Sequence, residues 1–93
     1  MEIDVRPFAS FRDALGRDGV VRELEEGATV GDLLASLEAT HPGLEGRLLA
    51  PDGSFHPAVT VLLNGRHVSH FEGVETALAP GDRVTLSPPV TGG

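Results

Sequence analysis

Residues 29–43 read Thr-Val-Gly-Asp-Leu-Leu-Ala-Ser-Leu-Glu-Ala-Thr-His-Pro-Gly, and this stretch decides the fold. Thr29 and Asp32 form a Thr-x-x-Asp pattern that can cap the start of a helix and place an acid in its first turn. Pro42 disfavours helical geometry at the residue before it, and the glycine that follows permits an exit. The stretch therefore predicts the principal helix of the chain over about residues 29–40. Its apolar residues fall at helical spacing and form one stripe: Val30, Leu33, Leu34 and Leu37.

Two strands are predicted before this helix. Residues 2–8 alternate apolar and charged side chains, as a half-buried strand does. A short helical turn follows, which Ser10 can cap and Gly16 can end at a positive φ. Residues 20–24 then form the second strand. The two strands most simply make a hairpin with an enlarged loop.

More strands are predicted after the helix. Residues 44–49 are expected to add a further turn of helix, and Pro51-Asp52-Gly53-Ser54 is a strong turn signal. Residues 59–63 alternate as a strand, and Asn64-Gly65 supplies the positive-φ positions that a type I′ hairpin requires. Residues 66–70 are then expected to return as the partner strand.

The last strand, residues 83–87, completes a run of hairpins around one helix, without repeated strand-helix-strand units. This order predicts an α+β fold in which a mixed, mostly antiparallel sheet of about five strands carries the main helix across one face. A chain of 93 residues without a visible repeat is expected to form one domain, which we assign to residues 1–87.

Residues 88–93, Pro-Pro-Val-Thr-Gly-Gly, are predicted to leave the sheet as an extended tail. The two prolines fix φ and remove two backbone donors, so the strand cannot continue past Ser87. The two glycines lack a Cβ, so the end of the chain can enter a channel too narrow for other residues. These features suit a tail presented to another protein, whereas the glycines alone are also compatible with a frayed terminus.

The composition excludes several classes of function. Seven basic against fourteen acidic residues give a net charge of −7, which makes nucleic acid and membrane surfaces poor partners. The N-terminal residues show no targeting pattern and no apolar run approaches a membrane span, so we expect a cytoplasmic protein. The chain has neither lysine nor cysteine, which excludes a lysine-type phosphate loop, a Schiff base and a thiolate nucleophile. Genomic composition or a salt-rich niche can explain the missing lysine without reference to function.

The chemistry open to the tail follows from what the chain lacks. A carboxylate is a poor acyl donor and must be activated, for example by adenylation, before sulfur or an amine can displace the activating group. The sequence holds no glycine-rich phosphate cradle, so a partner that uses ATP must supply this step. Without cysteine, sulfur can be carried only on the C-terminal acyl group, as a thiocarboxylate. We therefore expect a protein that is not an enzyme and has no cofactor of its own.

The sequence resembles the ubiquitin-like sulfur carrier family, which includes the molybdopterin synthase small subunit and the small archaeal ubiquitin-like modifier proteins. The resemblance covers nearly the whole chain, and the final hexapeptide is its most specific part. The segments that carry it are VRPFASF (5–11), ATVGDLL (28–34), VLLNG (61–65), LAPGD (78–82) and PPVTGG (88–93).

The resemblance implies a ubiquitin-like β-grasp fold and a reactive C-terminus. By resemblance, Gly93, preceded by Gly92, would be adenylated by a ubiquitin-activating-type enzyme and converted to the thiocarboxylate. It would then enter the large subunit of molybdopterin synthase and donate sulfur to a pterin precursor in molybdenum cofactor biosynthesis. The family also implies that the exposed sheet face and the tail dock the partner. The matching residues here are Phe8, His67, Ser87, Pro88, Pro89, Val90 and Thr91.

Two other functions stay open at this stage. The first is a small archaeal-type modifier, joined through its C-terminal glycine to the lysines of substrate proteins; the acidic, lysine-free composition favours it, although such a modifier could not form lysine-linked chains of itself. The second is a ubiquitin-like binding module that does not use its tail. The sulfur carriers of cysteine biosynthesis share the same ending, whereas thiamine-pathway carriers are usually shorter and lack the Pro-Pro exit.

No metal site is predicted. His67 and His70 lie three positions apart, and on a strand such residues face opposite sides. Paired acids such as Glu25 and Glu26 are typical of a solvated face rather than of a general acid and base. The four phenylalanines are expected to divide between the core and the docking surface: Phe8, Phe11, Phe55 and Phe71.

Overall fold

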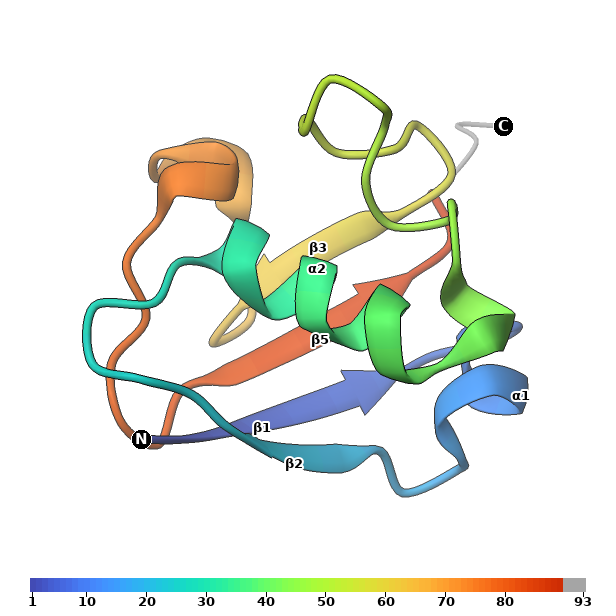
Figure 1. The fold of residues 1–93 in the computed structure, drawn as a ribbon, viewed down its shortest axis with the longest axis horizontal. Coiled ribbons are helices and arrows are strands. Elements are labelled where there is room, and N and C mark those ends of the chain that lie inside the picture. The colour runs from blue at the N-terminus through green and yellow to red at the C-terminus, as the bar shows by residue number, and fades with distance from the viewer. Residues whose placement is uncertain (90–93) are drawn as a thin grey trace.

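The computed structural model describes residues 1–89, which form a five-stranded sheet with one main helix. Helix α2 lies across one face of the sheet, and the short helix α1 lies at one end of it (Figure 1). The predicted architecture of a mixed sheet with a single principal helix is confirmed. The elements are β1 Glu2–Pro7, α1 Phe11–Leu15, β2 Val20–Glu23, α2 Val30–Thr40, β3 Thr60–Leu63, β4 Arg66–His67 and β5 Arg83–Ser87, with 3₁₀ helices η1 Pro42–Leu44, η2 Val68–His70 and η3 Gly73–Glu75.

The strand order is β2-β1-β5-β3-β4, so the first and last strands of the chain pair in the middle of the sheet. Strands β1 and β5 run parallel, with Val5 opposite Val84. The other three pairings, β1 with β2, β3 with β4 and β3 with β5, are antiparallel. The expectation of a mostly antiparallel, mixed sheet is therefore confirmed, and β5 is flanked by a neighbour on each side.

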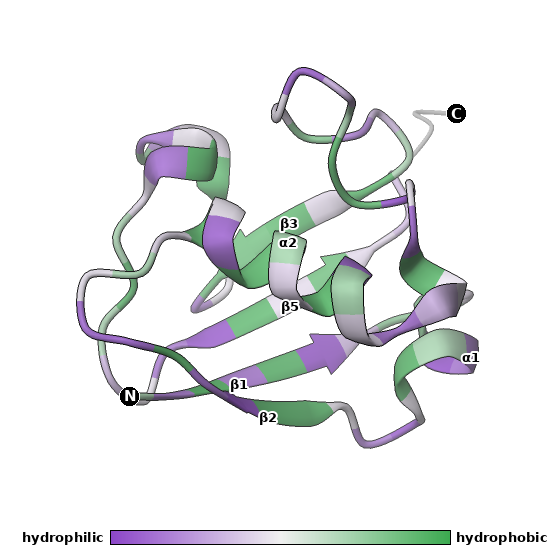
Figure 2. Ribbon diagram, viewed as in Figure 1, coloured by the Kyte–Doolittle hydropathy of each residue, from purple (hydrophilic) through white to green (hydrophobic). Residues whose placement is uncertain are grey.

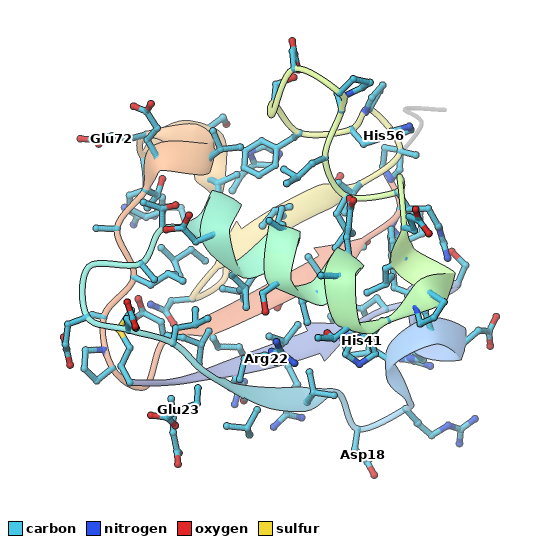
Figure 3. The ribbon with its side chains drawn as sticks, in the orientation of Figure 1. Asp18, Arg22, Glu23, His41, His56 and Glu72 are labelled. Atoms are coloured by element: carbon cyan, nitrogen blue, oxygen red, sulfur yellow. The ribbon has the colours of Figure 1, made fainter. Side chains whose placement is uncertain are left out.

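The core lies between the sheet and α2. The inner residues of β1, β3 and β5 and the predicted apolar stripe of α2 are fully or almost fully buried, and Figure 2 shows apolar and polar residues alternating along β1. At the edge of this layer, Arg22 of β2 donates hydrogen bonds to the hydroxyls of Ser36 and Thr40 on α2. Figure 3 shows Arg22 directed toward the helix while the adjacent Glu23 points away from it.

Helix α2 begins as the sequence predicts. The backbone N–H of Asp32 donates to Thr29 Oγ1 over 3.1 Å, and the backbone N–H of Thr29 donates to Asp32 Oδ2 over 2.9 Å. This reciprocal pair is a capping box, which satisfies two backbone donors that the first turn leaves free. The helix ends at Thr40, one residue before His41, in agreement with the effect of Pro42.

Four local predictions need correction. Helix α1 does form, and Gly16 ends it with a φ of 88°, but the Ser10 side chain makes no cap hydrogen bond. The extra helical turn expected over residues 44–49 forms earlier, as η1. The strand expected over residues 66–70 stops at His67, because residues 68–70 turn into η2. The opposite-face argument for His70 is therefore wrong, since this residue does not lie on a strand.

Glu38 of α2 holds the segment that replaces the expected extra turn. Its carboxylate accepts hydrogen bonds from the backbone N–H groups of Gly46 (3.2 Å), Leu48 (2.9 Å) and Leu49 (2.7 Å). Leu48 is fully buried in the core. A single acidic side chain thus satisfies three backbone donors of a non-repetitive segment and fixes the position of a core residue.

The two turn signals are confirmed in structure. Asn64 and Gly65 have φ values of 51° and 86°, as a type I′ turn requires, and they connect β3 to β4. In the turn at residues 51–54, Asp52 Oδ1 accepts hydrogen bonds from the hydroxyl (2.6 Å) and the backbone N–H (3.0 Å) of Ser54. These bonds, the hydroxyl bond foremost, lower the pKa of the Asp52 carboxyl because they stabilise its charged form.

Among residues 1–89, none of the helices could span a bilayer. The main helix has eleven residues, against the roughly 20 apolar residues that a spanning helix needs.

Candidate functional site

The tail leaves the sheet from its central part. Strand β5 ends at Ser87, whose hydroxyl donates to the Pro88 carbonyl oxygen over 3.0 Å. Pro88 is half-buried and Pro89 is exposed. Because β1 and β3 bind β5 on its two sides, the root of the tail is held firmly. The remaining predicted site residues lie outside the described residues: Val90, Thr91, Gly92 and Gly93.

The face of the sheet opposite α2 carries the outward side chains of four strands beside this root. One row crosses the sheet through Arg6, Thr85, Leu62 and His67, each paired with the next across neighbouring strands. A second row runs through Ser87 and its partner Thr60, from β5 to β3. This outer face is the surface next to the tail that a partner protein can reach.

The predicted docking residues do not form one continuous cluster. Phe8 is 49% exposed, and its backbone N–H donates to the Leu86 carbonyl oxygen over 2.8 Å, so it lies beside Ser87 at the root of the tail. His67 is exposed on the edge strand β4, with β3 between it and β5. Its Nδ1 accepts a hydrogen bond from the backbone N–H of Ser69 over 3.0 Å, which caps η2. A docking role for these residues stays a prediction.

Sequence reasoning missed a group of arginines around Phe8. A shallow hollow on the outer face, which we call the arginine hollow, is lined by Arg6, Phe8, Arg12, Arg17, Arg83 and Thr85, together with Pro7. The Arg12 guanidinium lies over the Phe8 ring, 5.7 Å from its centroid, within the range of a cation–π contact. Arg6 and Arg83 both contact Asp4, with Nε to Oδ2 distances of 3.1 and 3.2 Å.

Part of this surface carries a signal in the sequence. Arg6 of β1 and Phe8, the residue after the end of β1, are two positions apart, so strand alternation predicts them on the same face. Leu62 is an apolar residue at an outward position of β3, so this face is not covered by polar side chains alone. Arg83 joins the hollow only because β5 pairs with β1, which no local pattern indicates.

Within residues 1–89, no group of three His, Asp or Glu side chains is placed to hold a metal ion.

Comparison with known proteins decides the family. Residues 5–93 match the ThiS family. The chain belongs to the ThiS family. It is 50% identical over 93 residues to small archaeal modifier protein 3 of Haloferax volcanii, with all of both chains covered. It is 34% identical over 93 residues to a molybdopterin synthase sulfur carrier subunit of Chlamydomonas reinhardtii, again with all of both chains covered.

A solved structure agrees with the fold of this ThiS-family chain. The crystal structure of SAMP1 from Haloferax volcanii superposes with a TM-score of 0.81 at 34% identity and covers 100% of each chain. The ubiquitin-like β-grasp fold and the resemblance to sulfur carriers and small archaeal modifiers are thereby confirmed. These relatives are small carrier or modifier proteins by name, and the chain is a ubiquitin-like member of the same carrier and modifier family.

Proposed function

We propose that this chain is a ubiquitin-like sulfur carrier for molybdopterin, and so for molybdenum cofactor, biosynthesis. The observation that carries the proposal is a Pro-Pro-Val-Thr-Gly-Gly tail that follows the central strand of a ThiS-family domain. The similarity to a molybdopterin synthase sulfur carrier subunit over the whole chain supports the molybdopterin assignment. In this function residues 1–87 are the body that a partner grips, and residues 88–93 are the part on which it acts.

The architecture suits a tail that another protein must reach. Six residues at about 3.3 Å each could reach at most roughly 20 Å beyond Ser87, enough to enter an active site below a partner's surface. The root is rigid because β5 is paired on both sides, so docking of the body fixes where the tail starts. A fixed root reduces the conformational freedom that binding must restrict.

The proposed chemistry has two steps, both performed by partner enzymes. An oxygen of the Gly93 carboxylate attacks the α-phosphorus of ATP, an acyl adenylate forms and pyrophosphate leaves. A partner's persulfide then attacks the acyl carbon and AMP leaves, which gives an acyl disulfide. A second thiol of a partner attacks the donor's sulfur of this S–S bond, so that a disulfide forms on the partner side and the thiocarboxylate is released; a hydrosulfide nucleophile would give the thiocarboxylate directly. The ATP belongs to the ubiquitin-activating-type adenylating enzyme, and the chain acts as its substrate rather than as an enzyme.

The large subunit of molybdopterin synthase is the proposed acceptor of the charged tail. There the thiocarboxylate sulfur would pass to the pterin precursor. The predicted cytoplasmic location is consistent with such partners and stays a prediction.

A second function, conjugation to proteins, is favoured by a different observation. The chain shares 50% of its residues with a protein named as a small archaeal modifier. In that function the ε-amine of a substrate lysine attacks the acyl carbon, either of the same acyl adenylate or of a thioester formed from it on a partner. An isopeptide bond forms, the amine loses a proton, and AMP or the partner's thiol leaves. The chain itself has no lysine, so self-conjugation through lysine is excluded.

Mass spectrometry of the intact protein, isolated from its host, separates these functions. A chain that is heavier by one sulfur-for-oxygen exchange at Gly93 identifies a carrier. Covalent adducts of the whole chain on the lysines of other proteins, which trypsin would trim to residues 84–93 because Arg83 is the last basic residue, identify a modifier. An unaltered carboxylate under all growth conditions contradicts both functions. Removal of Gly93 should abolish the modification while the urea unfolding curve stays superimposable on that of the full chain.

A further inference from the structure

The basic charge of this acidic protein is concentrated at one place on its surface. The net charge is −7, and the seven basic residues are all arginines. Four of them line the arginine hollow, although they come from separate segments: β1, α1, the loop after α1, and β5. Such clustering places a positive surface on a molecule whose other faces are mainly acidic.

The hollow is only partly neutralised by the chain itself. In the described part of the chain, its arginines form ion pairs with one carboxylate, that of Asp4, which serves both Arg6 and Arg83. Arg12 lies over the Phe8 ring, and neither Arg12 nor Arg17 has a carboxylate within ion-pair distance among residues 1–89. The hollow therefore retains positive charge available to a partner.

The side chains define what the hollow can recognise. A guanidinium group offers a planar fork of donors that matches a carboxylate, and it also stacks on aromatic and apolar surface. Half of the Phe8 side chain is exposed between these groups. A short protein segment with Asp or Glu residues next to an apolar side chain can bind both the guanidinium groups and the Phe8 ring. A long phosphate backbone would extend beyond the hollow and be repelled by the acidic residues of the rest of the surface.

The hollow also lies next to the tail. The backbone N–H of Phe8 is bonded to the carbonyl oxygen of Leu86, the residue before the end of β5. Arg6 is opposite Thr85 in the same pair of strands. A partner segment bound in the hollow thus lies one or two residues from Ser87, where the tail begins. The tail is the part of the chain that must enter the same partner.

We propose that the arginine hollow is the docking site for an acidic segment of the enzyme that adenylates the tail. The proposal rests on the proposed function and names the chemistry of its partner. Attraction between the arginine hollow and the acidic segment would orient the chain as it approaches the enzyme, so that the tail faces the active site. Charges at the rim of an interface act mainly on the rate of association and on its salt dependence.

The test is the kinetics of pyrophosphate release by the adenylating enzyme of the same host, with the full-length chain as the varied substrate. The double variants Arg6→Gln with Arg17→Gln and Arg6→Glu with Arg17→Glu should raise KM about tenfold or more, with the glutamate pair raising it further. The kcat should stay within about twofold of wild type, because the tail is untouched. Arg66→Glu on β4 is the matched control and should leave KM within about twofold.

Two further measurements identify the cause as charge. The wild-type KM should rise with KCl, and the KM of the glutamine double variant should be much less sensitive to salt. Asp4→Asn removes the carboxylate that forms ion pairs with Arg6 and Arg83, so these arginines become available to the partner and KM should fall. A misfolded variant cannot give a lower KM. Thermal unfolding of every variant should stay close to that of wild type.

An unchanged KM in both double variants, or an equal rise in the Arg66→Glu control, overturns the docking site. Duplex DNA that binds wild type but not the double variants, with KM unaffected, would assign the hollow to phosphate instead and also overturn it. These failures differ from a failure of the proposed function, in which wild type itself supports no pyrophosphate release.

Discussion

Replacing Glu38 by alanine should destabilise the domain by about 2–4 kcal/mol, because three backbone N–H groups lose their acceptor. A hydrogen bond to a charged group contributes about 1.5–3 kcal/mol, and water can replace part of that at a half-exposed site. Two of the three bonds, to Leu48 and Leu49, are partly buried, whereas the bond to Gly46 is exposed and 3.2 Å long. We therefore count about two effective bonds, each worth about 1–2 kcal/mol once water replaces part of the interaction, which gives the total of about 2–4 kcal/mol. The lost hydrogen bonds position the segment that contains the core residue Leu48. The substitution should therefore lower the free energy of unfolding of the whole domain.

Urea unfolding followed by far-UV circular dichroism measures this loss. The midpoint should fall while the slope of the transition stays constant, since the unfolded surface is unchanged. Glu38→Gln should lie between wild type and Glu38→Ala, because its amide keeps one acceptor oxygen. Glu45→Ala removes an exposed carboxylate close in sequence and should change the free energy of unfolding by less than about 0.5 kcal/mol. A Glu38→Ala variant as stable as this control would refute the reasoning.

Three further predictions concern local structure. Thr29→Ala removes the side-chain half of the capping box and should lower the free energy of unfolding by about 1–2 kcal/mol, measured with the same urea titration. Gly19→Ala should lower the free energy of unfolding by more than about 2 kcal/mol, because the new Cβ would overlap a main-chain carbonyl oxygen of β1. Gly46 has a similar φ but lies in open space, so Gly46→Ala should lower it by only about 1 kcal/mol. Equal losses in the two variants would contradict the steric explanation. In an NMR titration the pKa of Asp52 should lie below its ordinary value and should rise in Ser54→Ala. Because folding lowers this pKa, the hydrogen bonds of the turn stabilise the protein at a pH above the pKa of Asp52 in the unfolded chain. This stabilisation is lost as the pH falls through the pKa of Asp52 in the folded protein.

The parts of the fold that the sequence predicted are those with local physical causes. The capping box, the apolar stripe of α2 and the positive φ at Asn64-Gly65 each depend on residues close together in the chain. The last strand was predicted with its correct bounds because proline cannot continue a ladder past Ser87. Local steric and hydrogen-bonding rules therefore account for these elements without tertiary contacts.

The parts that the sequence did not predict depend on contacts across the chain. Glu38 looks like any exposed helical acid until the distant segment that it binds is placed beside it. Ser10 fits a cap by residue type, but its hydroxyl instead accepts a hydrogen bond from Arg47, 37 positions away. The arginine hollow requires the parallel pairing of β1 with β5, which alternation alone cannot reveal. For the same reason, resemblance could suggest Phe8 and Ser87 as docking residues but not the charge around them.

The pairing of the first strand with the last has a consequence for when the protein becomes usable. Strand β5 lies between β1 and β3 and is the last strand to be synthesised. Until the ribosome has made it, the β2-β1 pair and the β3-β4 pair have no strand that joins them into one sheet. Pairing between strands far apart in the sequence is slow, because the entropy of loop closure is lost before the contacts form. The glycine end follows directly after the strand that completes the sheet. Under the proposed function, an enzyme that must bind the folded body before it reaches the tail would therefore not act on nascent or truncated chains. Activation of the terminus would then also report that the molecule has been built to completion.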